Sequence, residues 1–147
     1  MDTIVRGANE QDLARLLTFL EAAKLGTEGV AAAVDYFLLV EDMQGNLKAM
    51  VGIEPAGEAG LLRSLVISEG MTDKEILMLF EQMLILARDK QLKELYLATN
   101  KQDSLLFFNM LGFTAIERND LPTSIHQLKH VKYILNVDNS RFLALSI

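Results

Sequence analysis

The strongest constraint on the fold is a strand pattern, a long helical pattern and a second strand pattern that follow one another between residues 59 and 99. Residues 59–67 read AGLLRSLVI and residues 93–99 read KELYLAT, and both are mainly apolar runs of strand length. Residues 73–90 contain ten apolar residues among eighteen, interrupted by a polar stripe, as in a helix buried over most of its circumference. Because the intervening helix returns the chain to the start of the sheet, the two strands are predicted to lie parallel.

The segments before this unit predict an antiparallel meander. Strand patterns at residues 35–42 and 46–55 are separated by the turn residues MQGN, and the strand at 59–67 follows after a second turn. The chain opens with a predicted strand at residues 3–6. A predicted helix follows, which Asn9 caps with Asp12 and Gly26 ends, and then a short helix at residues 27–34.

The segments after the unit predict a helix in DSLLFFNMLGF that Gly112 ends, a strand at residues 113–117, and a helix after Pro122. A last apolar segment, RFLALSI, occupies residues 141–147. The predicted fold class is a mixed α/β sheet, with antiparallel strands first and one parallel pair in the middle.

Composition restricts the functions that such a domain can have. The 147 residues are half hydrophobic, which fits a single domain over residues 1–147. The 14 basic and 20 acidic residues give a net charge of −6, which disfavours a nucleic-acid partner. The absence of cysteine excludes a thiolate nucleophile and a cysteine-ligated zinc. Unbroken apolar runs reach only five residues, so neither a membrane span nor a signal peptide is expected, and we expect a cytoplasmic protein.

The motifs LLRSLVI, LKELYLAT, FFNMLGF and ERNDLP occur in the order and spacing of the GCN5-related N-acetyltransferases, which the chain resembles over most of its length. The most specific part is residues 95–113, and the overall pattern is most similar to small bacterial members associated with arsenic operons or amino-acid acetylation. The resemblance implies the acetyltransferase fold with a splayed parallel strand pair. It also implies acetyl-coenzyme A as cofactor and a small amine or amino acid as acceptor.

The resemblance further implies where the cofactor would bind. In this family it lies between the two parallel strands, here residues 61–67 and 94–99, and its pantetheine arm pairs with the first strand's backbone. Asn100 and Ser104 match positions that touch this arm or line its tunnel. The candidate cofactor-binding residues are Leu65, Val66, Ile67, Thr72, Asp73, Lys74, Glu75, Asn100, Ser104, Phe107 and Phe108.

The loop that would receive the pyrophosphate departs from the family pattern Arg/Gln-x-x-Gly-x-Gly/Ala. The family's arginine falls on Thr72 and its glycines fall on Asp73, Glu75 and Leu77. Thr72 and Glu75 instead have the spacing of a capping box, which satisfies the helix end without a ligand. Two carboxylates beside a diphosphate are repulsive, and Lys74 offsets one of them. We therefore predict weak or absent coenzyme A binding. The alternative is a shifted pose that uses the strand backbone and the amides of residues 72–74.

Candidate catalytic residues are few. Glu54, beside Pro55, is the first candidate for the base that deprotonates the amine, and Glu41 is the second and also a substrate-binding candidate. Arg63 can hold a substrate carboxylate bidentately, or it can lie on the exposed face of its strand. Phe108 stands where many relatives carry a tyrosine acid. His126 and His130 have helical spacing but lack a third ligand, so no metal site is predicted.

Two functions follow from these observations. The first is an N-acyltransferase that uses Glu54 as base and Arg63 to orient the substrate. The second is a catalytically inactive binding or assembly module that keeps the fold and forms a homodimer with the help of the apolar tail RFLALSI.

Overall fold

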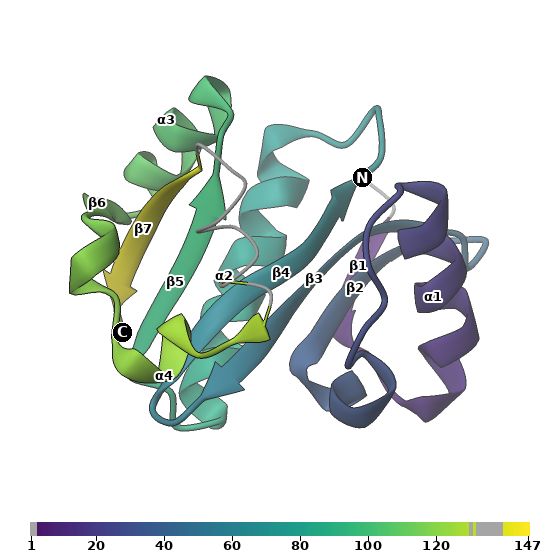
Figure 1. Cartoon of the computed structure of the whole chain (residues 1–147). Coiled ribbons are helices and arrows are strands. Elements are labelled where there is room, and N and C mark those ends of the chain that lie inside the picture. Colours follow the sequence, from purple (N-terminus) through teal and green to yellow (C-terminus); the bar gives the residue numbers. More distant parts are fainter. Residues whose placement is uncertain (1–2, 130, 132–139) are drawn as a thin grey trace. The chain divides into compact units, whose positions relative to one another are not determined.

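The computed structural model describes residues 3–129, 131 and 140–147 (Figure 1). The strands are β1 (Thr3–Gly7), β2 (Phe37–Asp42), β3 (Leu47–Ala56), β4 (Ala59–Ile67), β5 (Glu94–Thr99), β6 (Thr114–Ile116) and β7 (Arg141–Ser146). The helices are α1 (Leu13–Ala22), α2 (Asp73–Asp89), α3 (Gln102–Met110) and α4 (Thr123–His126), with 3₁₀ helices η1 (Glu10–Asp12), η2 (Ala31–Tyr36) and η3 (Arg118–Asp120).

The strands form a mixed sheet in the order β1-β2-β3-β4-β5-β7-β6. The chain divides into two compact units. Strand β4 is shared, because its residues up to Leu61 belong to the second unit and its residues from Leu62 belong to the first. The first unit is Met1–Glu54 with Leu62–Asp89, and the second is Pro55–Leu61 with Lys90–Ile147. In the described part of the chain, no helix is both long and apolar enough to cross a membrane.

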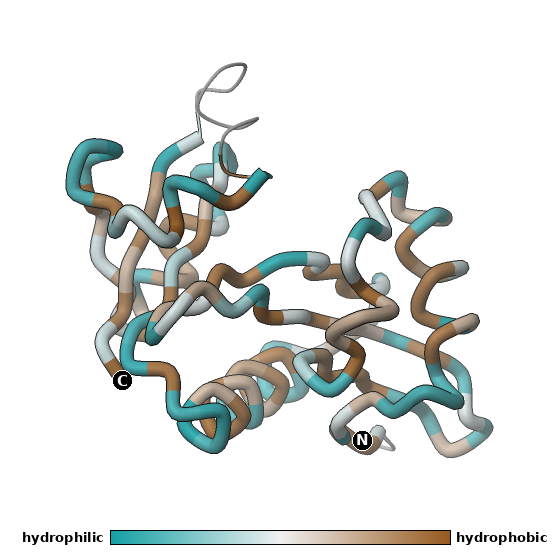
Figure 2. The backbone as a smooth tube through the Cα atoms, turned by 60° about the horizontal axis from the view of Figure 1, so that its bottom comes forward, coloured by the Kyte–Doolittle hydropathy of each residue, from teal (hydrophilic) through white to brown (hydrophobic). Residues whose placement is uncertain are grey.

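The first unit is built on the antiparallel meander of β1, β2 and β3, in which Val40 lies opposite both Val5 and Ala49. All four residues at the start of β2 are buried, as in a strand with both faces covered. Phe37 and Leu39 belong to a core cluster that includes residues of α1, while α2 contacts β1 and β2. Figure 1 shows α1 and α2 on opposite sides of these strands, and Figure 2 shows hydrophobic residues recurring along both helices.

The second unit contains the predicted parallel pair. Ala59–Leu61 of β4 pairs in parallel with Glu94–Tyr96 of β5, which confirms the prediction. β5 pairs with β7 along its length, and β7 pairs on its other side with β6. Tyr96, Ile125 and Phe142 belong to one buried cluster, so β5, α4 and β7 share a core. The mixed α/β fold class is therefore confirmed.

The end of α1 differs from the prediction. The helix ends at Ala22, and the amide of Leu25 donates to the carbonyl of Leu20 at 2.9 Å. Lys24, with φ of 60°, adopts the left-handed conformation that closes the helix, so the prediction that Gly26 ends it is wrong. The start of this helical segment agrees with the prediction, because Asn9 and Asp12 form the predicted capping box. The capping box lies at the start of η1, which directly precedes α1.

One other expectation needs correction. The short helix predicted at residues 27–34 is the 3₁₀ helix η2 at Ala31–Tyr36. The apolar tail is the inner strand β7, and its backbone pairs with β5 and β6 of the same chain. Because Phe142 and Leu143 are buried by these neighbours, the apolar character of this segment is explained by the core of its own unit. The homodimer that this tail is predicted to help form stays a prediction.

Candidate functional site

The start of α2 is the position where the family resemblance places the pyrophosphate. The amide of Thr72 donates to Glu75 Oε1 at 3.0 Å, and the amide of Glu75 donates to Thr72 Oγ1 at 3.1 Å. These two bonds form the predicted capping box. The Thr72 hydroxyl also donates to Glu75 Oε1, and the hydroxyl of Thr3 in β1 donates to Glu75 Oε2 at 2.6 Å. The Thr3 contact was missed by sequence reasoning, because 72 residues separate the partners.

These contacts hold Glu75 in its charged form. Its side chain is buried, and the hydrogen bond from Thr3, followed by that from the Thr72 amide, lowers its pKa below the ordinary glutamate value. The neighbouring Asp73 and Lys74 are exposed. Within the described chain the amides of Asp73 and Lys74 have no acceptor, since the first bond of the helix ladder runs from Ile76 to Thr72. The helix start therefore offers two amides to an anion and presents two carboxylates beside them.

The β4 segment that would pair with the pantetheine arm contains a backbone irregularity. Leu65 and Val66 are half-buried and Ile67 is exposed. Ser64, directly before them, has φ of 57° inside a strand, a conformation that few non-glycine residues adopt. No motif marks Ser64 in the sequence, so this irregularity could not have been predicted. Backbone strain of this kind is often found where a binding site is built.

Arg63, the candidate for a substrate carboxylate, is half-buried in β4. Its Nε donates to Ser64 Oγ at 3.1 Å. In the described part of the protein its guanidinium contacts no carboxylate, and its Nη1 is 3.5 Å from the position that a Cβ on Gly29 would occupy. Most of the hydrogen-bond donors of this guanidinium are therefore not engaged by the residues that the structure describes.

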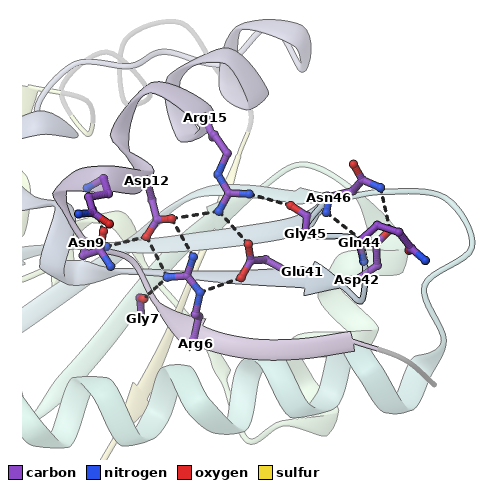
Figure 3. A network of polar contacts seen from close by, with 11 residues as sticks. Arg6, Gly7, Asn9, Asp12, Arg15, Glu41, Asp42, Gln44, Gly45 and Asn46 are labelled. Carbon is purple, nitrogen blue, oxygen red and sulfur yellow. Dashed lines mark hydrogen bonds and ion pairs between the residues drawn. The ribbon is translucent and has the colours of Figure 1, made fainter.

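Glu41, the second base candidate, belongs to a charged network in the first unit (Figure 3). Its Oε1 accepts from Arg6 Nε at 2.7 Å, and its Oε2 accepts from Arg15 Nη2 at 2.9 Å. Both guanidiniums also contact Asp12, which is 4 % exposed. The hydrogen bonds from Arg6 and then Arg15 lower the pKa of Glu41, which makes it a poor proton acceptor. The network instead connects β1, α1 and β2.

Glu54, the first base candidate, lies near the end of β3 and is half-buried. Within the described chain its carboxylate has no hydrogen-bond or ion-pair partner. It is therefore available for a proton or a ligand, in contrast to Glu41.

The remaining cofactor candidates lie in the second unit. Asn100 is exposed after β5, and Ser104 is half-buried in the first half of α3. Phe108 is 5 % exposed, and its ring makes edge-on contacts with Phe107 at 5.4 Å and Phe113 at 5.6 Å between centroids. The Phe108 side chain thus belongs to a packed aromatic group, and it has no proton to donate to a thiolate.

His126, one of the two histidines with helical spacing, contacts a backbone carbonyl in the described chain. Its Nε2 lies 3.0 Å from the carbonyl oxygen of Arg118, and His130 lies outside the described residues. Among the residues that the structure covers, no three histidine or acidic side chains gather to hold a metal ion.

The second unit also carries a surface pocket of about 760 Å³ between β6, η3 and the start of β7, which sequence reasoning did not indicate. Arg118 and Arg141 line it together with Glu117 and Asp120. Arg118 donates to the carbonyl of Ser140 at 3.0 Å and lies over the ring of Phe142. Because its charges are mixed and Arg118 is already engaged, the pocket shows no preference for an anion.

Comparison with known proteins finds a relative in sequence and several in structure, while no family model matches the chain. The protein named Uncharacterized protein YwlB, from Bacillus subtilis strain 168, is 39% identical over 114 residues, which cover 77% of this chain and 78% of YwlB. This identity and coverage place the two chains in one family.

The similar solved structures are acetyltransferases at lower sequence identity. N-acetylglutamate synthase from Neisseria gonorrhoeae, in complex with coenzyme A and N-acetyl-glutamate, has a TM-score of 0.77 and 18% identity over 99% of this chain, which spans 35% of that protein. Rv2747 from Mycobacterium tuberculosis, in complex with coenzyme A, has a TM-score of 0.76 and 19% identity, covering 98% of this chain and 99% of Rv2747. A GNAT-family acetyltransferase from Staphylococcus aureus Mu50 has a TM-score of 0.73 and 18% identity, covering 98% of both chains.

The similar structures confirm the acetyltransferase fold that the sequence motifs predicted. The chain belongs to the same family as YwlB of Bacillus subtilis and has the fold of the GCN5-related N-acetyltransferases.

Proposed function

We propose that this protein is an N-acyltransferase that transfers the acetyl group of acetyl-coenzyme A to a small amine or amino acid and that holds coenzyme A weakly. The fold supports the reaction class, since the Neisseria gonorrhoeae and Mycobacterium tuberculosis structures contain coenzyme A. The start of α2 supports weak binding. Its capping box already occupies the amides of Thr72 and Glu75, which leaves the amides of Asp73 and Lys74 for a pyrophosphate.

The proposed reaction asks little of the protein beyond positioning and one proton acceptor. Acetyl-coenzyme A supplies an activated thioester. A bond forms between the amine nitrogen and the acetyl carbon, the carbon–sulfur bond breaks, the nitrogen loses a proton, and the thiolate gains one. Glu54 is the proposed acceptor of the amine proton, because its carboxylate is half-buried and has no partner in the described chain. Phe108 cannot protonate the thiolate, so water is the proposed donor.

The capping box is the observation that carries this proposal, and a titration with acetyl-coenzyme A tests it. By isothermal calorimetry we expect a dissociation constant in the weak part of the range of about 1 μM to 1 mM that is common for enzyme substrates. Asp73→Asn removes one of the two carboxylates beside the pyrophosphate. Because like charges at about 4 Å repel by about 1 kcal/mol in water, this change should tighten binding about fivefold at low salt.

Asp89→Asn is the matched control, since Asp89 is the last residue of the same helix and is exposed. It should leave the affinity unchanged. Tight binding by the wild type that Asp73→Asn weakens would contradict the proposed role of this helix start.

The self-capped helix also favours a second function, an inactive binding or assembly module. The contacts of Thr3 and Thr72 satisfy the Glu75 carboxylate from within the protein, so the capping box forms without a bound anion. No heat of binding and no rise in melting temperature at millimolar acetyl-coenzyme A would favour this function. Sedimentation at several protein concentrations would then test the homodimer expected for such a module.

A further inference from the structure

Arg63 differs from Arg6 and Arg15 of the first unit because no carboxylate among the described residues pairs with it. Arg6 and Arg15 each contact both Asp12 and Glu41. Arg63 is half-buried and, within the described chain, its one side-chain partner is the hydroxyl of Ser64. A partly desolvated guanidinium is stabilised by an anion, and none of the residues that the structure describes supplies one to Arg63.

The backbone of β4 determines which way Arg63 faces. Val66 packs against the core cluster that contains Val30 and Val34. Residues 63 and 66 are three apart, so a regular strand would direct their side chains to opposite faces. Arg63 Nη1 nevertheless lies beside Gly29, the residue directly before Val30 of that cluster. The left-handed conformation of Ser64, which lies between them, interrupts the alternation and accounts for this placement.

Gly29 places no side chain beside the Arg63 guanidinium. Its φ of +81° favours glycine, and a Cβ there would be 3.5 Å from Arg63 Nη1, which is ordinary contact distance. A longer side chain at this position would extend from that point of contact, over or beside the guanidinium. Gly29 therefore borders Arg63 without neutralising it.

We infer that Arg63 is a specificity-determining residue that binds a carboxylate of the acceptor, so that the protein acts on amino acids in preference to the corresponding simple amines. This inference rests on the proposed function. The planar fork of a guanidinium matches the two oxygens of a carboxylate, and Ser64 holds the Nε side of Arg63 so that its terminal nitrogens remain for the ligand. A charge-assisted pair of this kind corresponds to a preference of about 10- to 100-fold.

Matched pairs of acceptors test the inference. Each pair consists of an amino acid and the amine that remains when its carboxylate is removed: arginine and agmatine, histidine and histamine, tyrosine and tyramine, lysine and cadaverine. Release of free coenzyme A is measured with a thiol reagent for the wild type, Arg63→Ala, Arg63→Lys and Arg88→Ala. Arg88 is an exposed arginine in the last turn of α2, also without a carboxylate partner in the described chain.

For acceptors that the wild type uses, we expect kcat/KM to be about 10- to 100-fold higher for the amino acid than for its amine. Arg63→Ala should remove this preference by lowering the value for the amino acid alone, and Arg63→Lys should retain part of it. Arg88→Ala should keep the full preference. Equal use of both members of a pair by the wild type, or an unchanged preference in Arg63→Ala, would overturn the inference while leaving the acyltransferase proposal in place.

A binding experiment separates the two proposals. Backbone amide chemical shifts of the labelled protein, without acetyl-coenzyme A, are followed during titration with the same eight compounds. If no acceptor is acetylated but the amino acids still shift resonances near residues 29 and 63 in the wild type and not in Arg63→Ala, the proposed function fails and the carboxylate site stands. If neither member of any pair causes a shift that depends on Arg63, the carboxylate site is refuted. Melting temperatures confirm that each variant is folded.

Discussion

Glu75 connects the start of α2 to β1 through one carboxylate. It accepts hydrogen bonds from the amide and hydroxyl of Thr72 in its own helix turn and from the hydroxyl of Thr3 in β1. A buried carboxylate that loses a hydrogen bond retains the cost of its desolvation, because no water replaces the missing donor. The Thr3 hydroxyl therefore contributes to the stability of the first unit. It also helps to hold the Glu75 carboxylate in the capping box at the start of α2.

We predict that Thr3→Val lowers the free energy of unfolding by about 1–2 kcal/mol, since a hydrogen bond to a charged group is lost. Urea denaturation measures the change. Thr3→Ser keeps the hydroxyl and should cost less. Thr18→Val is a comparison at an exposed helix site, where the hydroxyl donates to the Ala14 carbonyl, and it should stay within about 0.5 kcal/mol of the wild type. Equal effects of Thr3→Val and Thr18→Val would show that the Glu75 contact adds nothing to stability.

The helix α1 ends on a residue with an unfavourable conformation for its type. Lys24 is exposed and has φ of 60°, which an L-residue with a Cβ adopts at a cost that glycine avoids. We predict that Lys24→Gly raises the free energy of unfolding by about 0.5–1 kcal/mol, measured by urea denaturation. Ala22→Gly, two residues earlier and inside the helix, should lower it by a similar amount. A loss of stability in both variants would contradict the left-handed end of α1.

The stability of the protein as a whole should depend on three carboxylates in the first unit. Hydrogen bonds lower the pKa values of Asp12, Glu41 and Glu75, with Arg6 as the largest cause for the first two and Thr3 for the third. A carboxylate whose pKa is lower in the folded than in the unfolded state stabilises the protein above its unfolded pKa of about 4. This stabilisation is lost as the pH falls through the unfolded and then the folded pKa.

We therefore expect the free energy of unfolding to be nearly constant from about pH 7 to pH 5.5 and to decrease below about pH 5. Urea denaturation at a series of pH values measures this. Asp12→Asn should be less stable at pH 7, because it leaves the Arg6 and Arg15 guanidiniums with fewer partners, and its stability should decrease less steeply with acid. Asp89→Asn should have the slope of the wild type. An Asp12→Asn slope equal to that of the wild type would show that the network does not account for the acid sensitivity.

The periodicity of the sequence was sufficient for most of the fold. The apolar runs at residues 59–67 and 94–99 and the helix between them required a parallel pair, and that pair is present. The capping boxes of Asn9 with Asp12 and of Thr72 with Glu75 were also predictable, because their members are three residues apart and their geometry is local. Such features depend on the spacing of residue types, which a sequence displays directly.

The tertiary structure alone decided which of the candidate residues remain available for chemistry. Glu41 and Glu54 are both glutamates near strand ends, yet only the structure shows that Arg6 and Arg15 engage Glu41 and that Glu54 has no partner in the described chain. Likewise, the left-handed Ser64 and the approach of Gly29 to Arg63 leave no local pattern. The sequence by itself determined the order and type of the elements, because these follow from short-range periodicity. Packing between residues far apart in the chain decided which partner each charged side chain has. It thereby decided which candidate site residues remain available to a ligand.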